Sequence, residues 1–199
     1  MLPLALALSV LIGVSLGLLG GGGSILTTPI LIYAIGLEPK EAIATSLLVV
    51  GITSLAGLVS HARAGNVAWR TGVIFGLAGM AGAYAGGFVA KWIPANVLLV
   101  LFALMMVATA IAMFRGRKAP ADGEKRTFAA WKIVLDGLVV GLVTGLVGAG
   151  GGFLVVPALA LLGGLPMPVA VGTSLLVIAM KSFAGFVLVM AAFVLYQQV

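Results

Sequence analysis

Six apolar segments of helix length follow one another along this chain of 199 residues. They span residues 2–35, 42–60, 71–90, 95–114, 133–162 and 169–196. About 20 apolar residues in a helix suffice to cross the hydrocarbon core of a bilayer. Only 8% of the residues are charged, against roughly 25% in a soluble domain, so a soluble fold cannot bury this much apolar surface. The sequence therefore predicts an all-α, polytopic transmembrane helix bundle.

The first and fifth segments are longer than one span requires, and glycines interrupt both of them. Thirty-odd helical residues would reach about 50 Å, whereas the hydrocarbon core is about 30 Å thick. The interruptions are Gly20 to Ser24 and Gly148 to Gly152, and a proline follows each of them, at Pro29 and Pro157. Each segment is therefore either one kinked, tilted span or a re-entrant pair of shorter helices.

The two halves of the chain match each other without a gap, at the constant offset that separates Gly13 from Gly141. Gly13, Gly17, Gly20, Gly22, Gly23 and Pro29 recur as Gly141, Gly145, Gly148, Gly150, Gly151 and Pro157, and Thr45-Ser46-Leu47-Leu48-Val49 recurs as Thr173-Ser174-Leu175-Leu176-Val177. Many secondary transporters consist of such repeats and bind substrate where the repeats meet. We predict a first transmembrane repeat over residues 1–114, a linker over 115–132, and a second repeat over 133–199 that lacks its last two helices.

Basic residues predict how the bundle is oriented. Two loops hold eight of the eleven Lys and Arg residues: Arg63, Arg70, Arg115, Arg117, Lys118, Lys125, Arg126 and Lys132. Loops rich in Lys and Arg stay on the cytoplasmic side, so both loops are expected there. The C-terminus is expected on this cytoplasmic side as well.

The glycine interruptions are the first candidates for a binding site. A broken helix exposes backbone N–H groups and a positive dipole end, which together bind anions without a basic side chain. The expected ligating residues are Gly21, Gly22, Gly23, Ser24, Gly150, Gly151 and Gly152. The alternative is that these glycines only allow a kink or close packing. Close packing is also predicted for residues 71–90, where small residues recur every three or four positions.

Hydroxyl groups early in the second and sixth segments are further candidates. Thr45, Ser46, Thr173 and Ser174 can donate to the oxygens of an anion, or they can bond to their own helix. His61 and Arg63, at the end of the second segment, form either an inner gate or a basic loop that sets the topology.

Lys181 lies in the middle of the sixth segment, where its counterpart in the first half is Thr53. An ammonium at this depth costs about 2.5–3.5 kcal/mol on insertion scales. Lys181 therefore either binds the anion in a cavity or extends to the lipid headgroups.

Several functions have no basis in the sequence. The chain has no Cys and one His, so thiolate and multi-His metal sites are not expected. The glycine runs lack the Lys-Ser/Thr ending of a phosphate-binding loop. We therefore expect no enzyme activity, no cofactor or metal, and no nucleic-acid partner.

The glycine-rich runs with their prolines, the two Thr-Ser-Leu motifs, and the loop with His61, Arg63, Gly65-Asn66 and Trp69-Arg70 together resemble the sulfite exporter TauE/SafE family. The resemblance implies a secondary transporter of small oxyanions, such as sulfite or organosulfonates, in the bacterial inner membrane. The substrate would bind near the bilayer midplane where the repeats meet. The alternative is a non-transporting scaffold, an accessory subunit or a truncated inactive fragment. Whether the chain forms a homo-oligomer stays open.

Overall fold

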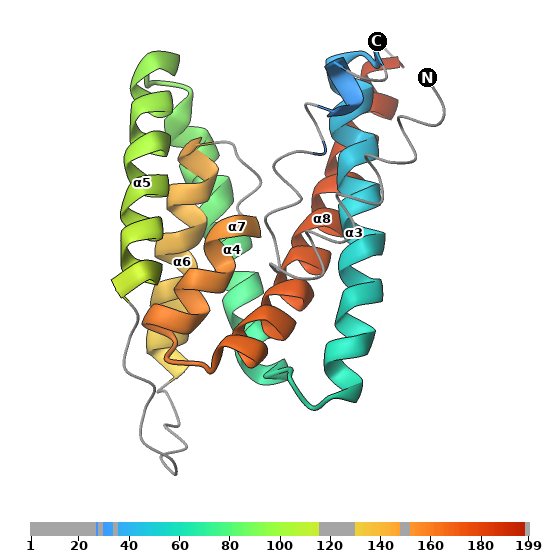
Figure 1. The fold of residues 1–199 in the computed structure, drawn as a ribbon. Helices are drawn as coiled ribbons and strands as arrows, with labels where there is room; N and C mark the ends of the chain where they lie inside the picture. The colour runs from blue at the N-terminus through green and yellow to red at the C-terminus, as the bar shows by residue number, and fades with distance from the viewer. Residues whose placement is uncertain (1–26, 28–29, 34–35, 116–129, 148–151, 198–199) are drawn as a thin grey trace.

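The computed structural model describes residues 27, 30–33, 36–115, 130–147 and 152–197. In this part of the chain all the elements are helical (Figure 1). They are α3 (Pro39–Arg63), α4 (Trp69–Ala90), α5 (Ala95–Arg115), α6 (Ala130–Val147), α7 (Gly152–Pro157), the π-helical turn η1 (Ala158–Leu162) and α8 (Met167–Gln197). The predicted all-α class is confirmed for these residues.

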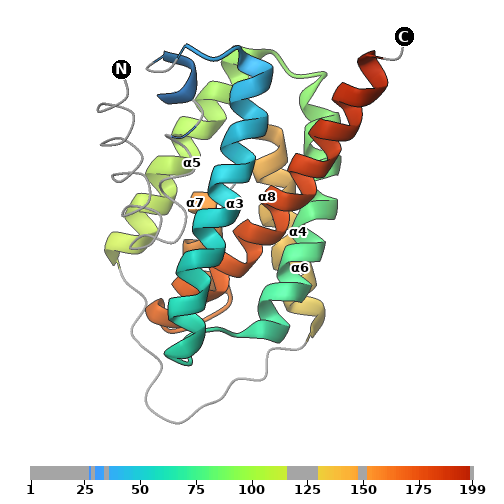
Figure 2. The same ribbon diagram turned by 90° about the vertical axis from the view of Figure 1, so that its right-hand side faces the viewer.

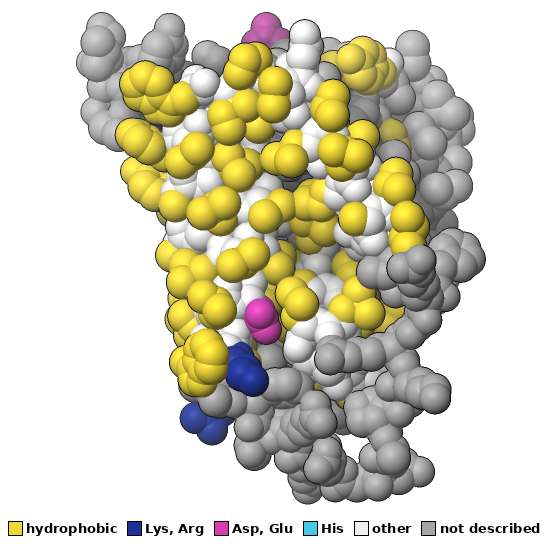
Figure 3. Space-filling model, turned by 90° about the vertical axis from the view of Figure 1, so that its left-hand side faces the viewer, with side chains coloured by type: hydrophobic (Ala, Val, Ile, Leu, Met, Phe, Trp, Pro, Cys, Tyr) yellow, Lys and Arg dark blue, Asp and Glu magenta, His cyan; other side chains and the backbone are white. Residues whose placement is uncertain are grey.

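Three of the described helices are long and apolar enough to cross a membrane: Glu41–Arg63, Trp69–Ala90 and Met167–Ala191. Residues Asn96–Ile111 form a shorter apolar stretch within α5. Large hydrophobic side chains cover the outside of the bundle, and Figure 3 shows one such face, with Lys and Arg only at its lower end. An apolar outer surface of this kind is expected for helices that face the hydrocarbon of a bilayer.

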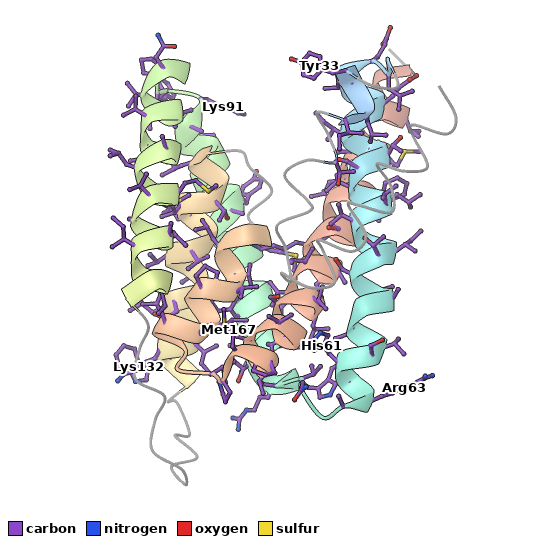
Figure 4. All side chains as sticks on the ribbon, in the orientation of Figure 1. Tyr33, His61, Arg63, Lys91, Lys132 and Met167 are labelled. Carbon is purple, nitrogen blue, oxygen red and sulfur yellow. The ribbon has the colours of Figure 1, made fainter. Side chains whose placement is uncertain are left out.

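The fifth apolar segment is a pair of helices that run in opposite directions. α6 begins at the end of the bundle where Lys132 lies, whereas α7 and η1 return to that same end before Met167 (Figures 1 and 4). α7 and η1 have 6 and 5 residues, so at about 1.5 Å per residue they cover only about half of the hydrocarbon thickness. Of the two alternatives for this segment, the structure has the re-entrant pair.

Because α7 and η1 return, α8 runs in the opposite direction to the one that a single crossing by the fifth segment would give it. α8 starts at the end of the bundle that holds Arg63 and Lys132, and it finishes at the end that holds Tyr33 and Lys91 (Figures 1 and 4). The expectation that the C-terminus shares the side of the basic loops is therefore wrong for the end of α8. The periodicity of apolar residues does not say whether a broken segment turns back.

α4 and α6 pack backbone against backbone. At each contact a glycine of one helix lies directly against a carbonyl group of the other. The pairs are Gly141 with the Gly79 carbonyl, Gly145 with the Ala83 carbonyl, Gly82 with the Leu138 carbonyl, and Gly86 with the Leu142 carbonyl. Small residues spaced in this way let membrane helices approach closely, since no Cβ separates them.

α8 is the central helix of the described part. It lies between α3 on one side and the α4–α6 group on the other (Figures 1 and 2). One buried cluster joins α8 to α4, α6, α7 and η1, and it includes Phe75, Val140, Val155, Leu159 and Val177. A second cluster joins α8 to α3, and it includes Val50, Leu58, Leu175, Leu176 and Ile178.

Local geometry recurs between matched residues of the two halves. The Leu37 N–H donates to the Leu31 carbonyl and the Leu165 N–H to the Leu159 carbonyl, both at 3.1 Å. The Ser46 hydroxyl donates to Ile43 at 2.8 Å and the Ser174 hydroxyl to Val171 at 2.7 Å. Gly36 and Gly164 both have positive φ, 79° and 56°, a conformation that glycine adopts readily at the end of a helix.

The contacts between α3 and α8 also join matched residues of the two halves. The Leu175 side chain lies against Gly57, where a Cβ would be 3.1 Å from its Cδ1 atom. The Leu47 side chain lies against Gly185, where a Cβ would be 3.4 Å from its Cδ1 atom. Leu47 and Leu175 are matched residues, and so are Gly57 and Gly185. The two helices run in opposite directions, so each half supplies one leucine and one glycine.

Candidate functional site

Lys181 lies close to the middle of the apolar stretch Met167–Ala191 of α8. At about 1.5 Å per residue, it is about 21 Å along the helix from Met167 and about 15 Å from Ala191. The ammonium group is therefore far from both ends of this stretch.

The Lys181 side chain points toward α4 and α6 and not toward α3. A Cβ placed on Gly79 would lie 3.3 Å from Cε and 3.4 Å from Nζ of Lys181. The same point lies 3.5 Å from the carbonyl oxygen of Gly137 in α6. We call Lys181, Gly79 and Gly137 the Lys181 junction. The absence of a side chain at Gly79 is what lets the half-buried lysine reach this position.

Among the described residues, Asp136 of α6 is the carboxylate that lies in the apolar segments around the Lys181 junction, and it directly precedes Gly137. The sequence has no Asp, Glu, Lys or Arg in residues 42–60, 71–90, 137–180 or 182–199. Asp136 is the nearest acid in the chain to Gly137, and its electrostatic partner is Lys132, one turn earlier on α6. A membrane-buried charge normally has a partner, and Lys181 forms no ion pair with the described residues, so its ammonium indicates a functional group.

Two buried serines lie close to the level of Lys181, between the two leucine–glycine contacts of α3 and α8. Ser54 is 0% exposed and Ser182 is 5% exposed, and they are matched residues of the two halves. The Ser54 hydroxyl has no hydrogen-bond partner among the described residues. An unbonded buried hydroxyl costs about 1–3 kcal/mol, so this group is available to a ligand or a water molecule.

The two Thr-Ser pairs do not meet. Thr45 lies near the start of α3 and Thr173 near the start of α8, at opposite ends of two antiparallel helices. At about 1.5 Å per helical residue, Thr45 and Thr173 are about 21 Å apart along the axes of the two helices. The hydroxyls of Ser46 and Ser174 donate hydrogen bonds to backbone carbonyls of their own helices. This is the alternative that the sequence offered to substrate binding.

Thr173 instead joins α8 to the loop between α3 and α4. Its Oγ1 accepts a hydrogen bond of 3.0 Å from the Ala68 N–H. One residue earlier, Gly172 lies directly against the Asn66 carbonyl, where a side chain would not fit. This loop is thereby fixed against the start of α8.

His61 and Arg63 lie at the same end of the bundle (Figure 4). His61 is half-buried against Gly172, and its Nδ1 has no hydrogen-bond partner among the described residues, whereas Arg63 is exposed. His61 therefore belongs to the contact between the loop and α8, and Arg63 belongs to the basic surface at the end of α3.

Replacing Thr173 by valine should destabilise this contact. Valine keeps the shape of the side chain but leaves the Ala68 N–H without its acceptor, so we expect a loss of about 1–3 kcal/mol in the free energy of unfolding. The matched control is Thr45→Val, the equivalent change in α3, for which we expect a smaller loss. Equal losses, measured by thermal unfolding in detergent, would contradict the role given to the Ala68–Thr173 bond.

The remaining candidate residues are partly outside the described structure. Gly21, Gly22, Gly23, Ser24, Gly150 and Gly151 lie outside the described residues, whereas Gly152 is the buried first residue of α7. Among the described residues, no three His, Cys, Asp or Glu side chains come together as a metal site would require. Sequence reasoning missed Gly79, Gly137 and Gly172 as neighbours of candidate residues. For Gly79, the three- and four-residue spacing of small residues indicated close packing but not which side chain it would face.

Comparison with known proteins places the chain among membrane transporters. The profile of the family described as Sulfite exporter TauE/SafE matches residues 5–199. A "Probable membrane transporter protein" of Xylella fastidiosa (strain Temecula1) is 42% identical over 172 residues, which cover 84% of this chain and 66% of the relative. "Probable membrane transporter protein MJ0441" of Methanocaldococcus jannaschii is 31% identical over 193 residues, 94% of this chain and 72% of the relative. The chain thus spans slightly less than two thirds of the length of the Xylella relative. No solved structure matches it.

Proposed function

The chain belongs to the sulfite exporter TauE/SafE family and is an integral membrane protein, and from this premise we propose that it is a secondary transporter of small oxyanions. Sulfite and organosulfonates are the expected substrates. The bacterial inner membrane is the expected location.

The observation that carries this proposal is the Lys181 junction. A single ammonium lies at mid-membrane depth, against Gly79 of α4, and Asp136 is the acidic residue in the apolar segments around it. Ionisable residues at such depth mark substrate and ion pathways, because burying them has a free-energy cost that structure alone does not repay. A positive charge without a partner favours an anionic substrate.

We place the substrate between two repeats of inverted topology, residues 1–114 and 133–199, joined by a cytoplasmic linker over residues 115–132. The recurring hydrogen bonds and the reciprocal leucine–glycine contacts support this arrangement, and so does the antiparallel course of α3 and α8. Transporters of this kind bind substrate near the bilayer midplane, where their repeats meet. Lys181, Ser54 and Ser182 all lie near that level.

Two groups complete the proposed site. The buried hydroxyls of Ser54 and Ser182 supply neutral donors close to the level of Lys181 along the helices. The glycine interruptions, Gly21 to Ser24 and Gly150 to Gly152, supply backbone N–H groups, as broken helices do in other transporters. Thr45, Ser46, Thr173 and Ser174 serve the packing of helices in this proposal, because the described hydrogen bonds of three of them stay within the fold.

Flux into liposomes tests the proposal. The purified full chain should move sulfite and a small sulfonate across the membrane faster than protein-free liposomes do. Gly22→Leu and Gly150→Leu should each abolish this flux while membrane insertion persists, because leucine blocks the approach of an anion to the backbone. An intact, inserted protein that moves neither anion would favour the alternative, a non-transporting scaffold or accessory subunit.

A further inference from the structure

We propose that the Lys181 junction neutralises one negative charge only, so that the protein selects singly charged oxyanions over doubly charged ones of similar size. The expected class contains sulfonates and hydrogen sulfite, and it excludes sulfate. This inference rests on the proposed function, since it specifies the substrate of the same site.

Among the described helices, Lys181 is the single cation at its level of the bundle. The four apolar stretches that form α3, α4, α6 beyond Asp136, and α8 hold no second Lys or Arg. Residues 148–151 of the fifth segment hold none either, and neither does the first segment, residues 1–37. His61 and Arg63 lie at one end of the bundle, about 15 Å or more along α3 from the level of Lys181. Lys181 therefore offers one full positive charge at this level of the bundle, with no second cation in these stretches.

The free energies of binding separate the two classes of anion. The cost of moving an ion out of water rises with the square of its charge, so it is about fourfold larger for a dianion than for a monoanion of the same size. Attraction to one ammonium rises only in proportion to the charge, so it is about twofold larger. A monoanion leaves the site neutral, whereas a dianion leaves a net negative charge among apolar helices without a partner.

The carbonyl group of Gly137 strengthens the preference for monoanions over dianions. A carbonyl oxygen presents partial negative charge, and it lies on the same side of Lys181 as Gly79. It can accept a hydrogen bond from the ammonium but it repels a second anionic oxygen. The Gly137 carbonyl therefore opposes a further negative charge on the α6 side of Lys181.

Equilibrium binding to the purified full chain tests the inference without depending on flux. Methanesulfonate and sulfate carry similar oxygens and differ in charge, so isothermal titration with each is compared at equal ionic strength. We expect methanesulfonate to bind at least about tenfold more tightly than sulfate. Lys181→Met should remove most of this affinity, and Lys91→Met, at the exposed end of α4, should leave it unchanged.

The outcomes separate this inference from the proposed function. Sulfate binding as tightly as methanesulfonate, or a preference that survives Lys181→Met, would overturn selection by charge while leaving oxyanion transport intact. A preference that depends on Lys181 in a protein without flux would support selection and contradict transport. Binding of neither anion by a folded protein would overturn both proposals.

Discussion

Replacing Gly86 by alanine should lower the free energy of unfolding by about 1–3 kcal/mol, since overpacking a tight contact has a cost of this size. The new Cβ would meet the Leu142 carbonyl of α6 at a distance that no real Cβ shows. A backbone carbonyl in the middle of a helix cannot move aside as a flexible side chain can. α4 and α6 must therefore separate, and thermal unfolding in detergent, followed by circular dichroism, measures the loss.

Gly87 provides the matched control. It is the next residue of α4, and a Cβ there would have its nearest neighbour, the Gly145 carbonyl oxygen, at 3.9 Å. Gly87→Ala should therefore be neutral or stabilising, because alanine favours the helix over glycine by about 1 kcal/mol. Both variants share this gain in helix propensity, so their difference isolates the contact with α6. Similar stabilities of the two variants would contradict the packing of α4 on α6.

Lys181→Met should reduce oxyanion affinity and flux by about tenfold or more. A hydrogen bond to a charged group contributes about 1.5–3 kcal/mol, and methionine removes the charge but keeps the length of the side chain. Folding should be unaffected or improved, because the burial cost of the ammonium disappears. Affinity from isothermal titration and thermal stability, measured on the same purified protein, distinguish this result from a folding defect.

Two further variants make the Lys181 result specific. Lys181→Arg should restore activity only in part, because a planar guanidinium does not fit a junction formed around a compact ammonium. Lys91→Met removes an equal charge from the exposed Lys91, whose ammonium lies over the Phe88 ring, and should leave affinity unchanged. Unchanged affinity in Lys181→Met would remove the lysine from the site.

The positions of the membrane helices could be predicted from sequence because they depend on local composition. The segments expected at residues 71–90 and 95–114 correspond to α4 (Trp69–Ala90) and α5 (Ala95–Arg115). The interruption of the fifth segment was also evident, since glycine and proline weaken a helix wherever they occur in it. These features require no knowledge of which helices are neighbours.

Features that depend on contacts between distant helices could not be predicted. The hydrogen bond from the Ala68 N–H to Thr173 joins residues that lie 105 positions apart in the sequence. The fit of Lys181 against Gly79 depends on the side of α8 that faces α4, and a nearly uniform apolar helix does not indicate that side. The return of α7 toward the start of α6 depends in turn on the packing of Val155 and Leu159 against Phe75 and Val140.

The reciprocal leucine–glycine contacts have a mechanical consequence for the α3–α8 pair. The contacts of Leu175 with Gly57 and of Leu47 with Gly185 are of the same kind and lie at two different levels along the pair. A tilt of one helix against the other compresses one contact and opens the other, and the opposite tilt does the reverse. The two tilted arrangements therefore exchange contacts of the same kind, as expected for a rocking element with two states. A substitution at only one of the two glycines would favour one tilt over the other.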